Sequence, residues 1–429
     1  MNSPAIGLDF GTTNSSIALV DANGRPQLAS FAADDGPTET FRSVLYFEED
    51  EETGRTCIHA GPDAIDHYLA SEEKNGRLVQ SLKSFLASQL FSATRVMERT
   101  YRLEDLIALL LTPLREQAEA RFGLRIERIV AGRPVHFVGA ETPEAEELAM
   151  TRLTAAMHNA GFREVTFEFE PVGAAYHYEQ RLTTDELILI ADFGGGTSDF
   201  SLLRVGPSFA GPGRRTESIL GHDGVGLAGD AFDGKLVRHL VAPRLGRGAE
   251  FRSLMGNVLP IPAWIYRHLE RWHHVSLLKS RKTLQLLLDL RREALEPEKL
   301  EALIHVVRAD LGFLLFRATE QLKRTLSEQP SGTFRFEHEH VGIAALLPRD
   351  RFEEWIAEEL ACIENCVDGL LERTGVPPEA VDRVFLTGGS SFVPAVRALF
   401  LARFGADRVT SGAELTSVAS GLALRAAER

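Results

Sequence analysis

The chain has 429 residues, of which 44% are hydrophobic and 25% are charged, and its formal net charge is −14. This length and composition predict two or three domains of an ordinary soluble globular protein. The acidic balance argues against nucleic acid as the main partner and gives no reason to expect an anionic membrane surface. No apolar run is long enough to span a bilayer, and the opening residues MNSPAIGLDF lack the pattern of a signal peptide.

Three cysteines, Cys57, Cys362 and Cys366, are too few for a disulfide framework, which favours a reducing, cytoplasmic setting. Cys362 and Cys366 are four positions apart in a helical stretch. A metal pair there would need further ligands nearby, and none is obvious. We therefore expect both to be small, buried apolar side chains.

The stretch Leu187–Leu203 predicts two strands joined by a glycine turn. Ile188–Ala191 is a short apolar run typical of a strand buried on both faces, and Phe200 resumes a strand after the turn. The turn consists of Gly194, Gly195 and Gly196. Glycine turns expose several backbone N–H groups in one concavity, which suits a phosphate.

Polar side chains flank this turn. Asp192 precedes it, where a carboxylate could hold a metal ion that accompanies the phosphate, and Thr197 and Asp199 lie on the returning strand. The sequence therefore predicts a phosphate site with an adjoining cation site.

The same design occurs at the N-terminus, where an apolar strand leads into Asp9-Phe10-Gly11-Thr12-Thr13 and a second strand follows. Both copies contain Asp-Phe-Gly followed by threonine, which indicates two related halves. Two ordinary hairpins with glycine turns are the simpler alternative.

The two segments GLDFGTTNSSIAL and LIADFGGGTSDFSLL resemble the phosphate loops of the Hsp70 family, in the actin/hexokinase/Hsp70 superfamily. The resemblance implies an α/β actin-like ATPase fold: duplicated ribonuclease H-like lobes, each a mixed five-stranded sheet flanked by helices, with two inserted smaller subdomains. It places lobe I at 1–186, with a small subdomain at about 38–110. Lobe II would span 187–413, with a helix-rich insertion at about 229–328, and 414–429 would form a C-terminal helix returning to lobe I.

An apolar stripe predicts a helix over Arg77–Phe91, with Lys83 at the edge of the stripe, its stem packed and its ammonium reaching outward. Alone, this pattern indicates a surface lysine. The segment LVQSLKSFL, however, resembles the Hsp70 segment whose lysine orients the attacking water and stabilises the transferred phosphate, and this assigns that role to Lys83.

Two further segments resemble lobe I of the family. FEFEPVGAAYHY is similar to the crossover segment, so Glu170 is expected to face the nucleotide cleft, although alone it would be a solvated strand-end acid. AGRPVHF is similar to the strand that ends in the family's proline switch, here Pro134. The family's signalling arginine on the next helix corresponds to about Met150, which departs from the pattern.

Glu320, Lys323, Arg324 and Ser327 share one helix face by their spacing. A solvated, salt-bridged face is the simpler interpretation. RATEQLKRTLS nevertheless resembles the family's adenosine-binding helix, where the glutamate and lysine bind the ribose hydroxyls, the arginine stacks on adenine and the serine bonds the base.

The segment GGSSFVP resembles the family's adenosine loop, which assigns Gly388, Gly389 and Ser390 to nucleotide binding. The family's arginine in this loop is Phe392 here. SVASGLALRAAER resembles the terminal helix of the nucleotide-binding domain, and the aspartate expected before it is Leu415.

Leu245–Arg317 is leucine-rich and is predicted to be helical with breaks at Pro260, Pro262 and Pro297. Between Phe232 and Glu320 the chain has roughly 50 residues more than an ordinary Hsp70 would. The insertion could be a platform for a partner. The adjacent His273 and His274 would point apart on a helix and favour packing over metal binding. The resemblance covers the nucleotide-binding portion alone, as in truncated, YegD-type members of the family, so no peptide-binding domain is expected.

The resemblance implies a slow ATP hydrolase acting on Mg-ATP and coupled to an unidentified protein partner or client. Asp9, Glu170 and Asp192 would hold Mg²⁺ mainly through water. Lys83 would orient the nucleophilic water, Thr197 would help to place the γ-phosphate, and Asp199 would accept a proton or bind K⁺. The alternatives are a small-molecule kinase of the same superfold, an actin-like filament protein and a nucleotide-sensing module with little turnover.

Overall fold

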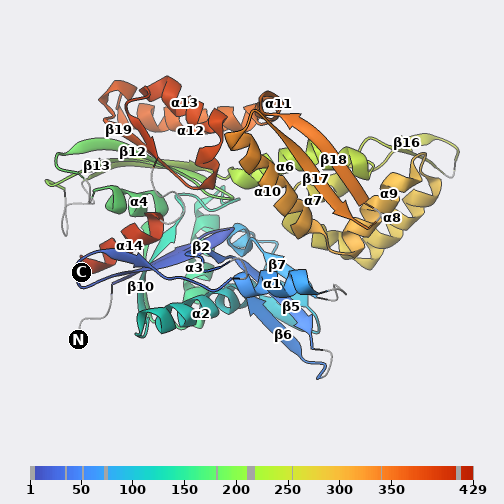
Figure 1. Cartoon of the computed structure of the whole chain (residues 1–429), viewed down its shortest axis with the longest axis horizontal. Coiled ribbons are helices and arrows are strands. Elements are labelled where there is room, and N and C mark those ends of the chain that lie inside the picture. The colour runs from blue at the N-terminus through green and yellow to red at the C-terminus, as the bar shows by residue number, and fades with distance from the viewer. Residues whose placement is uncertain are drawn as a thin grey trace. The chain divides into compact units, whose positions relative to one another are not determined.

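The computed structural model describes residues 5–33, 36–50, 53–71, 76–179, 182–209, 218–253, 255–339, 341–411 and 417–428. They belong to two compact units (Figure 1). The first unit consists of Met1–Gly229, Ala361–Ser391 and Val396–Arg429, and the second of Asp230–Leu360 and Phe392–Ala395. Across the described ranges, no helix combines the length and the apolar character that crossing a membrane requires.

The first unit contains two sheets with the same strand order and direction. One is β3 (Pro26–Leu28), β2 (Asn14–Val20), β1 (Ile6–Phe10), β10 (Arg128–Arg133) and β11 (Glu164–Phe169), with β4 (Phe41–Arg42) also on β2. The other is β14 (Ile219–Val225), β13 (Ser198–Val205), β12 (Glu186–Phe193), β19 (Arg383–Thr387) and β20 (Val409–Ser411). In each sheet three antiparallel strands continue into two parallel ones. This repeated topology, with helices packed on the sheets, agrees with the predicted α/β actin-like fold.

The helices of this unit are α2 (Leu103–Phe122), α3 (Pro143–Asn159), α4 (Glu170–Glu179), α12 (Ala357–Thr374), α13 (Pro394–Phe404) and α14 (Ser417–Ala427), with short 3₁₀ turns η5 (Pro378–Ala380) and η6 (Gly389–Phe392). Apolar side chains of α2 and α3 form one core with β1 and β10. A second core joins α4 and α14 to strands of both sheets (Figure 1). Both cores are continuous and apolar, so they fix the strand ends that carry the predicted site.

The C-terminal helix α14 packs directly on β1, β2, β10 and α4. Gly7 makes the close approach possible, because a Cβ atom there would lie 2.2 Å from the backbone nitrogen of Ala423. The predicted boundaries of the lobes themselves stay a prediction.

Residues 44–102 form a smaller layer with β5 (Val44–Glu49), β6 (Thr56–Ala60), α1 (Pro62–Ala70), β7 (Arg77–Gln80), the 3₁₀ turn η1 (Leu82–Phe85), β8 (Ala93–Val96) and β9 (Arg99–Arg102). The predicted helix over Arg77–Phe91 is therefore wrong. Its first residues pair with β5, and Ser81 turns the chain with a left-handed φ of 54°. Strand pairing outweighs the apolar periodicity here.

The second unit contains α6 (Gly229–Leu236), the π-helical turn η2 (Val237–Val241), η3 (Ala242–Leu245), α7 (Ala263–Leu269), η4 (Trp272–Lys279), α8 (Arg281–Glu293), α9 (Pro297–Arg308), α10 (Gly312–Glu328), the hairpin β17 (Ser331–His338) and β18 (Val341–Pro348), and α11 (Arg349–Trp355). The predicted breaks at Pro260, Pro262 and Pro297 coincide with element ends. The expectation of helix throughout is wrong at β15 (Glu250–Arg252) and β16 (Val258–Pro260), which form a hairpin.

The expectation that both cysteines of α12 are buried is wrong for Cys362, which is exposed, while Cys366 is half-buried. The buried face of α12 carries Ile363, Val367 and Leu370, and Cys362 lies outside it. Burial, followed by the charge of Asp223, raises the pKa of the Cys366 thiol to about 12, which disfavours its thiolate form.

Candidate functional site

Asp9 and Asp192 occupy equivalent places in the two sheets. Each is the penultimate residue of its strand, β1 or β12, directly before a glycine turn. Across the hairpin, Asp9 pairs with Ser16 and Asp192 with Asp199. The duplicated topology thus presents one acid from the first hairpin and two from the second.

Lys83 and Glu170 form a buried ion pair next to these acids. Lys83 lies on η1 and Glu170 opens α4, and both are less than a tenth exposed. The Lys83 Nζ atom donates a hydrogen bond of 2.5 Å to Glu170 Oε1. The expectation that the ammonium reaches outward is wrong: it is enclosed, because Glu170 accepts it. Gly132 on β10 leaves the space, since a Cβ atom there would lie 3.0 Å from Glu170 Cγ.

Burial and mutual repulsion shift the pKa values of the acids upward. Burial, followed by the charge of Glu170, raises the pKa of Asp9 to about 7 and that of Asp199 to about 7. The same causes, with the charges of Asp9 and Asp199 added, raise the pKa of Asp192 well above its usual value. Four carboxylates therefore share the single ammonium of Lys83.

The lysine itself stays charged. Burial alone would lower its pKa, but the negative charges of Glu170 and Asp9, together with the hydrogen bond to Glu170, outweigh that effect and raise it. Without this ammonium, the charge of Arg133, which acts on Glu170 and Asp199, would be left to offset the carboxylates.

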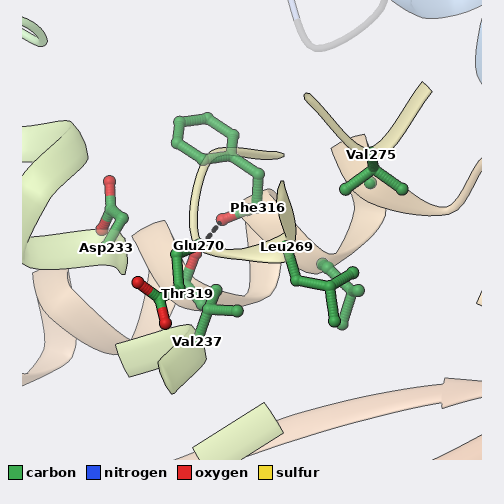
Figure 2. Close-up of a pocket in the computed structure, with 9 residues that line it drawn as sticks. Asp233, Val237, Leu269, Glu270, Val275, Phe316 and Thr319 are labelled. Atoms are coloured by element: carbon green, nitrogen blue, oxygen red, sulfur yellow. Dashed lines mark hydrogen bonds between the residues drawn. The ribbon is translucent and has the colours of Figure 1, made fainter. Parts of the chain in front are cut away.

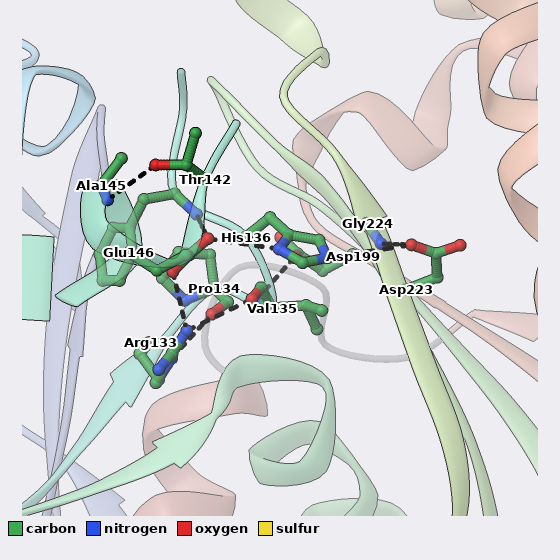
Figure 3. A network of polar contacts seen from close by, with 11 residues as sticks. Arg133, Pro134, Val135, His136, Thr142, Ala145, Glu146, Asp199, Asp223 and Gly224 are labelled. Carbon is green, nitrogen blue, oxygen red and sulfur yellow. Dashed lines mark hydrogen bonds and ion pairs between the residues drawn. The ribbon is translucent and has the colours of Figure 1, made fainter. Parts of the chain in front are cut away.

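Asp199 is held by a backbone donor from the first sheet. The Val135 N–H, just after β10, donates a hydrogen bond of 2.7 Å to Asp199 Oδ1, and this bond and the Thr197 side chain both oppose the upward pKa shift (Figure 3). Gly224 on β14 leaves room for the carboxylate, since a Cβ atom there would lie 2.7 Å from Asp199 Oδ1.

The loop that carries Val135 is fixed to α3 through Glu146. Its carboxylate accepts hydrogen bonds from Arg133 Nη2 at 3.1 Å and from the Phe137 N–H at 3.0 Å, and His136 Nδ1 lies 3.2 Å from it (Figure 3). Thr142 caps the start of the same helix by accepting from the Ala145 N–H. The residues on both sides of Pro134 are thereby anchored.

The first glycine turn, Gly11–Thr13, is anchored by Ser43, a contact that the sequence did not reveal. Ser43 Oγ donates to the Gly11 carbonyl at 2.8 Å, and the Ser43 N–H donates to the Thr13 carbonyl at 2.9 Å. Gly11 itself is required, because a Cβ atom there would lie 2.1 Å from the Asn14 carbonyl oxygen. Thr12 is buried and Thr13 is half-buried.

The second glycine turn is more open. Gly194 is exposed, Gly195, Gly196 and Thr197 are half-buried, and the Gly194 N–H donates to the Thr197 carbonyl at 2.9 Å. A Cβ atom on Gly196 would lie 3.5 Å from Thr12 Oγ1, so the two predicted phosphate turns approach each other.

The predicted adenosine loop follows β19. Gly388 has a φ of 82°, and a Cβ atom there would lie 2.1 Å from the Phe193 carbonyl oxygen, so only glycine fits. Gly389 is open to added atoms, whereas Ser390 is buried. The loop therefore packs closely against the backbone of β12, the strand that carries Asp192.

A positioning residue that the sequence analysis missed is Arg152 on α3. It is buried, and its Nη1 atom donates to the carbonyls of Leu86 at 3.0 Å and Ser88 at 2.8 Å. These carbonyls directly follow the turn that carries Lys83. Met150, the position compared with the family's signalling arginine, packs against the apolar core instead. Sequence signals could not find Arg152, because its acceptors are backbone atoms more than 60 positions away.

The predicted adenosine quartet lies on α10, in the second unit. Glu320, Lys323 and Ser327 are half-buried and Arg324 is exposed. Lys323 Nζ donates to Asp233 Oδ2 at 2.8 Å, and Ser327 Oγ donates to the Lys323 carbonyl at 3.0 Å.

A small pocket lies at Asp233, the partner of Lys323, and is lined in part by residues of α10. Asp233, Glu270 and Thr319 line it together with apolar side chains such as Phe316 (Figure 2). Asp233 Oδ1 is buried and makes no hydrogen bond, and burial raises the Asp233 pKa to about 6 despite Lys323. The pocket is therefore lined by the carboxylate that pairs with Lys323, a residue predicted to bond the ribose.

Two predicted departures from the family have different outcomes. Phe392 is exposed, so an apolar ring replaces the expected guanidinium at the surface. Leu415 lies outside the described residues.

The cluster in the first unit has the chemistry of a cation site. Four carboxylates surround one lysine, and three of them, Asp9, Asp192 and Asp199, have raised pKa values. If all four were ionised, their negative charge would exceed what the one lysine balances. Oxygen ligands of this kind suit Mg²⁺, which keeps most of its waters. Asp9, Glu170 and Asp192 therefore fit the expected ion.

Comparison with known proteins shows which family this chain resembles. The family model described as "Hsp70 protein" matches residues 5–245 and 313–427, so the unmatched segment falls within the predicted insertion. Chaperone protein DnaK of Thermotoga petrophila is 24% identical over 423 residues, which cover 98% of this chain and 59% of that protein. DnaK of Thermosipho africanus is 24% identical and DnaK of Thermosipho melanesiensis 23%, over the same number of residues. The chain thus spans less than two thirds of the length of these curated relatives. With two duplicated sheets, paired glycine turns and a family match over most of its length, the chain belongs to the Hsp70 family.

Proposed function

We propose that this chain is a slow, cytoplasmic ATP hydrolase that binds Mg-ATP and couples nucleotide-driven closure to a protein partner or client in folding or assembly. The observation that carries the proposal is the buried Lys83–Glu170 pair beside Asp9, Asp192 and Asp199, next to two glycine turns. Phosphoryl transfer asks a protein mainly for positioning and charge neutralisation, and this cluster supplies both. Family membership supports the same activity.

The acids near the turns would hold the metal. Asp9, Glu170 and Asp192 would bind Mg²⁺ largely through its waters. When bound, the ion would neutralise charge on the phosphates. The backbone N–H groups of Gly11–Thr13 and Gly195–Thr197 would bind the phosphates, with the Gly194 N–H closing the second turn onto the Thr197 carbonyl, and the Thr197 hydroxyl would help to place the γ-phosphate.

Lys83 and Asp199 would act on the attacking water. The Lys83 ammonium, kept charged by its neighbours, would orient the water and balance the negative charge that develops on the phosphoryl group. Asp199 has a pKa of about 7, which suits a group that accepts a proton near neutral pH. A K⁺ ion bound by Asp199 is the alternative role for this carboxylate.

The remaining predicted residues would bind the nucleoside. Glu320 and Lys323 would bond the ribose, Arg324 would stack on adenine, and Ser327 would bond the base. The loop Gly388–Ser390 would let the adenosine approach the backbone. Asp233, which holds Lys323 in the free protein, would release or share it on binding.

Single-turnover ATP hydrolysis by the wild type and Lys83→Ala, with Mg²⁺ and K⁺ present, tests the proposal. We expect slow hydrolysis by the wild type and a loss of about 100-fold in Lys83→Ala, with ATP affinity changed by less than about 10-fold. Lys299→Ala, which removes a lysine that pairs with Glu296 on the surface of α9, is the matched control. Wild-type turnover in Lys83→Ala would overturn the catalytic assignment.

A nucleotide-gated binding module with negligible turnover is the second candidate, and the exposed Phe392 at the family's arginine position favours it. Tight ATP binding without hydrolysis in either protein would support this candidate. A small-molecule kinase would have no use for the adenosine quartet, and an actin-like filament would scatter light on addition of ATP.

A further inference from the structure

A second group of ionisable side chains lies in the small layer of the first unit, apart from the Lys83 cluster. Glu48 comes from β5, His59 from β6, and Asp63 and His67 from successive turns of α1. The strand pairing aligns β5 with β6, and α1 packs over both strands. The fold thus gathers two imidazoles and two carboxylates from three elements.

The three inner side chains converge on one point. Glu48 Oε1 lies 3.0 Å from His59 Nε2 and 3.0 Å from His67 Nδ1, and one ligand atom of each residue lies within 4.8 Å of the others. Tetrahedral zinc sites bring nitrogen and oxygen ligands to about 2.0–2.2 Å from the ion, which places the ligand atoms a little over 3 Å apart. The observed separations are close to that requirement.

The His59 ring nitrogen on this side has no hydrogen bond. His59 Nε2 is buried, and although Glu48 is near, it does not lie in a direction that makes a hydrogen bond. A buried polar atom without a partner costs free energy, so native proteins rarely leave one without a purpose. A metal ion would use this lone pair.

Asp63 supports the opposite edges of the two rings. Its Oδ2 atom lies 2.7 Å from His59 Nδ1, and its Oδ1 atom lies 3.7 Å from His67 Nε2. Histidines that bind metals almost always donate their other ring N–H group to a carboxylate or carbonyl, which sets the tautomer and the ring orientation. Asp63 stands where that supporting carboxylate is needed.

We propose that Glu48, His59 and His67 form a binding site for a divalent transition-metal ion of the Zn²⁺ type, with Asp63 orienting the two rings. Two imidazoles and a carboxylate are the ligand set that such an ion prefers, whereas Mg²⁺ prefers oxygen. Three protein ligands leave one position for water or for a ligand from a partner. The bound ion would fasten α1 to the β5–β6 hairpin.

Ligation requires one local rearrangement. The His59 and His67 rings are stacked, with centroids 3.5 Å apart and an interplanar angle of 19°. His67 must rotate and exchange the hydrogen bond between its Nδ1 atom and Glu48 Oε1 for the ion, with its proton moved to Nε2 on the Asp63 side. Its side chain, which is 44% exposed, has the freedom to do so. His59, which is more enclosed, would keep its position against Asp63.

The experiment is a Zn²⁺ titration of the untagged, chelator-treated full chain in excess Mg²⁺, against a competing chromophoric chelator, with the melting temperature as second readout. We expect one equivalent of tightly bound Zn²⁺ and a rise in melting temperature of several degrees. His67→Gln and Glu48→Gln should each weaken binding by at least about 100-fold, and Asp63→Asn by about 10- to 100-fold. Melting of the metal-free variants verifies their folding, and Glu48→Gln keeps the test open if His67→Gln is unstable.

A matched control comes from another imidazole pair. On α9 and the β17–β18 hairpin, His305 Nε2 lies 3.0 Å from His338 Nδ1, with Glu339 nearby. His305→Gln should leave Zn²⁺ binding unchanged. The proposal is overturned if the wild type binds no stoichiometric Zn²⁺, if folded His67→Gln or Glu48→Gln binds as the wild type does, or if His305→Gln abolishes binding.

Discussion

The hairpins β1–β2 and β12–β13 have the same topology and the same aspartate before the turn, yet they differ in chemistry. The first places Ser16 opposite Asp9, whereas the second places Asp199 opposite Asp192. The first turn is tightly enclosed around Gly11, whereas the second leaves Gly194 exposed. A duplicated scaffold has therefore been divided into a rigid turn with one acid and an open turn with two.

The largest effect should come from the two matched aspartates. We expect Asp192→Asn to slow single-turnover ATP hydrolysis by about 100-fold or more, and to weaken ATP binding by less than about 10-fold, because its carboxylate acts on charge that develops in the transition state. Asp9→Asn should have a comparable effect on the rate if the two halves share one cation. Equal activity of Asp192→Asn and the wild type would contradict the catalytic role of Asp192. An Asp9→Asn variant with the wild-type rate would show that the two aspartates do not have equivalent roles.

The two turns should differ in their tolerance of a methyl group. Gly11→Ala brings a Cβ atom to 2.1 Å from the Asn14 carbonyl oxygen, whereas the nearest atom to a Cβ on Gly194 is 3.4 Å away. We expect Gly11→Ala to lower the free energy of unfolding by about 2–3 kcal/mol and Gly194→Ala by less than about 1 kcal/mol. Denaturant unfolding measures both, and equal losses would show that the turns do not differ in rigidity.

Asp199→Ser makes the second hairpin resemble the first and should change the pH dependence of stability. The pKa of Asp199 is raised to about 7 in the folded protein, so the folded protein holds this proton more tightly than the unfolded chain does. The resulting stabilisation is complete below the pKa of an aspartate in the unfolded chain, and it is lost as the pH rises through about 7. Between about pH 5.5 and about pH 8.5 the nucleotide-free wild type should therefore lose on the order of 2 kcal/mol more unfolding free energy than Asp199→Ser.

The measurement is denaturant unfolding of both proteins across that pH range without Mg²⁺ or nucleotide. Asp9 remains in both proteins, so its own titration cancels, and the difference reports Asp199 together with its effect on the pKa of Asp192. Parallel pH profiles would mean that Asp199 is ionised in the folded protein throughout.

The smallest effect should come from the Ser43 anchor of the first turn. Ser43→Ala removes the hydrogen bond from Ser43 Oγ to the Gly11 carbonyl and its contact of 2.9 Å with Ser15 Oγ. We expect a loss of about 1 kcal/mol in unfolding free energy. Ser92→Ala, at an exposed serine, should change it by less than about 0.5 kcal/mol, and a similar change in Ser43→Ala would show that the anchor is dispensable.

The sequence predicted those features that short-range patterns determine. Both hairpins were predicted from apolar runs that end in Asp-Phe-Gly, which also place Asp9 and Asp192 before the turns. Helix α2 (Leu103–Phe122) also follows from local signals, because its apolar stripe is long and a left-handed Gly123 ends it.

The features that failed depend on partners distant in the sequence. The segment around Lys83 has helical periodicity, but pairing of β7 with β5 and the left-handed Ser81 give it a different backbone. Enclosure of the Lys83 ammonium follows from Glu170, 87 positions later. Arg152 is invisible for the same reason, since it acts on backbone carbonyls that any sequence would provide.

The contact between α14 and β1 has a consequence for the biogenesis of the protein. Strand β1 leaves the ribosome well before α14, yet Gly7 packs against Ala423, about 400 residues later in the chain. Until α14 is synthesised, this face of the first sheet and the apolar side of α4 lack their cover, and exposed apolar surface of this kind favours aggregation. In this member of the Hsp70 family, apolar surface that the folded protein buries thus stays uncovered during synthesis until α14 docks.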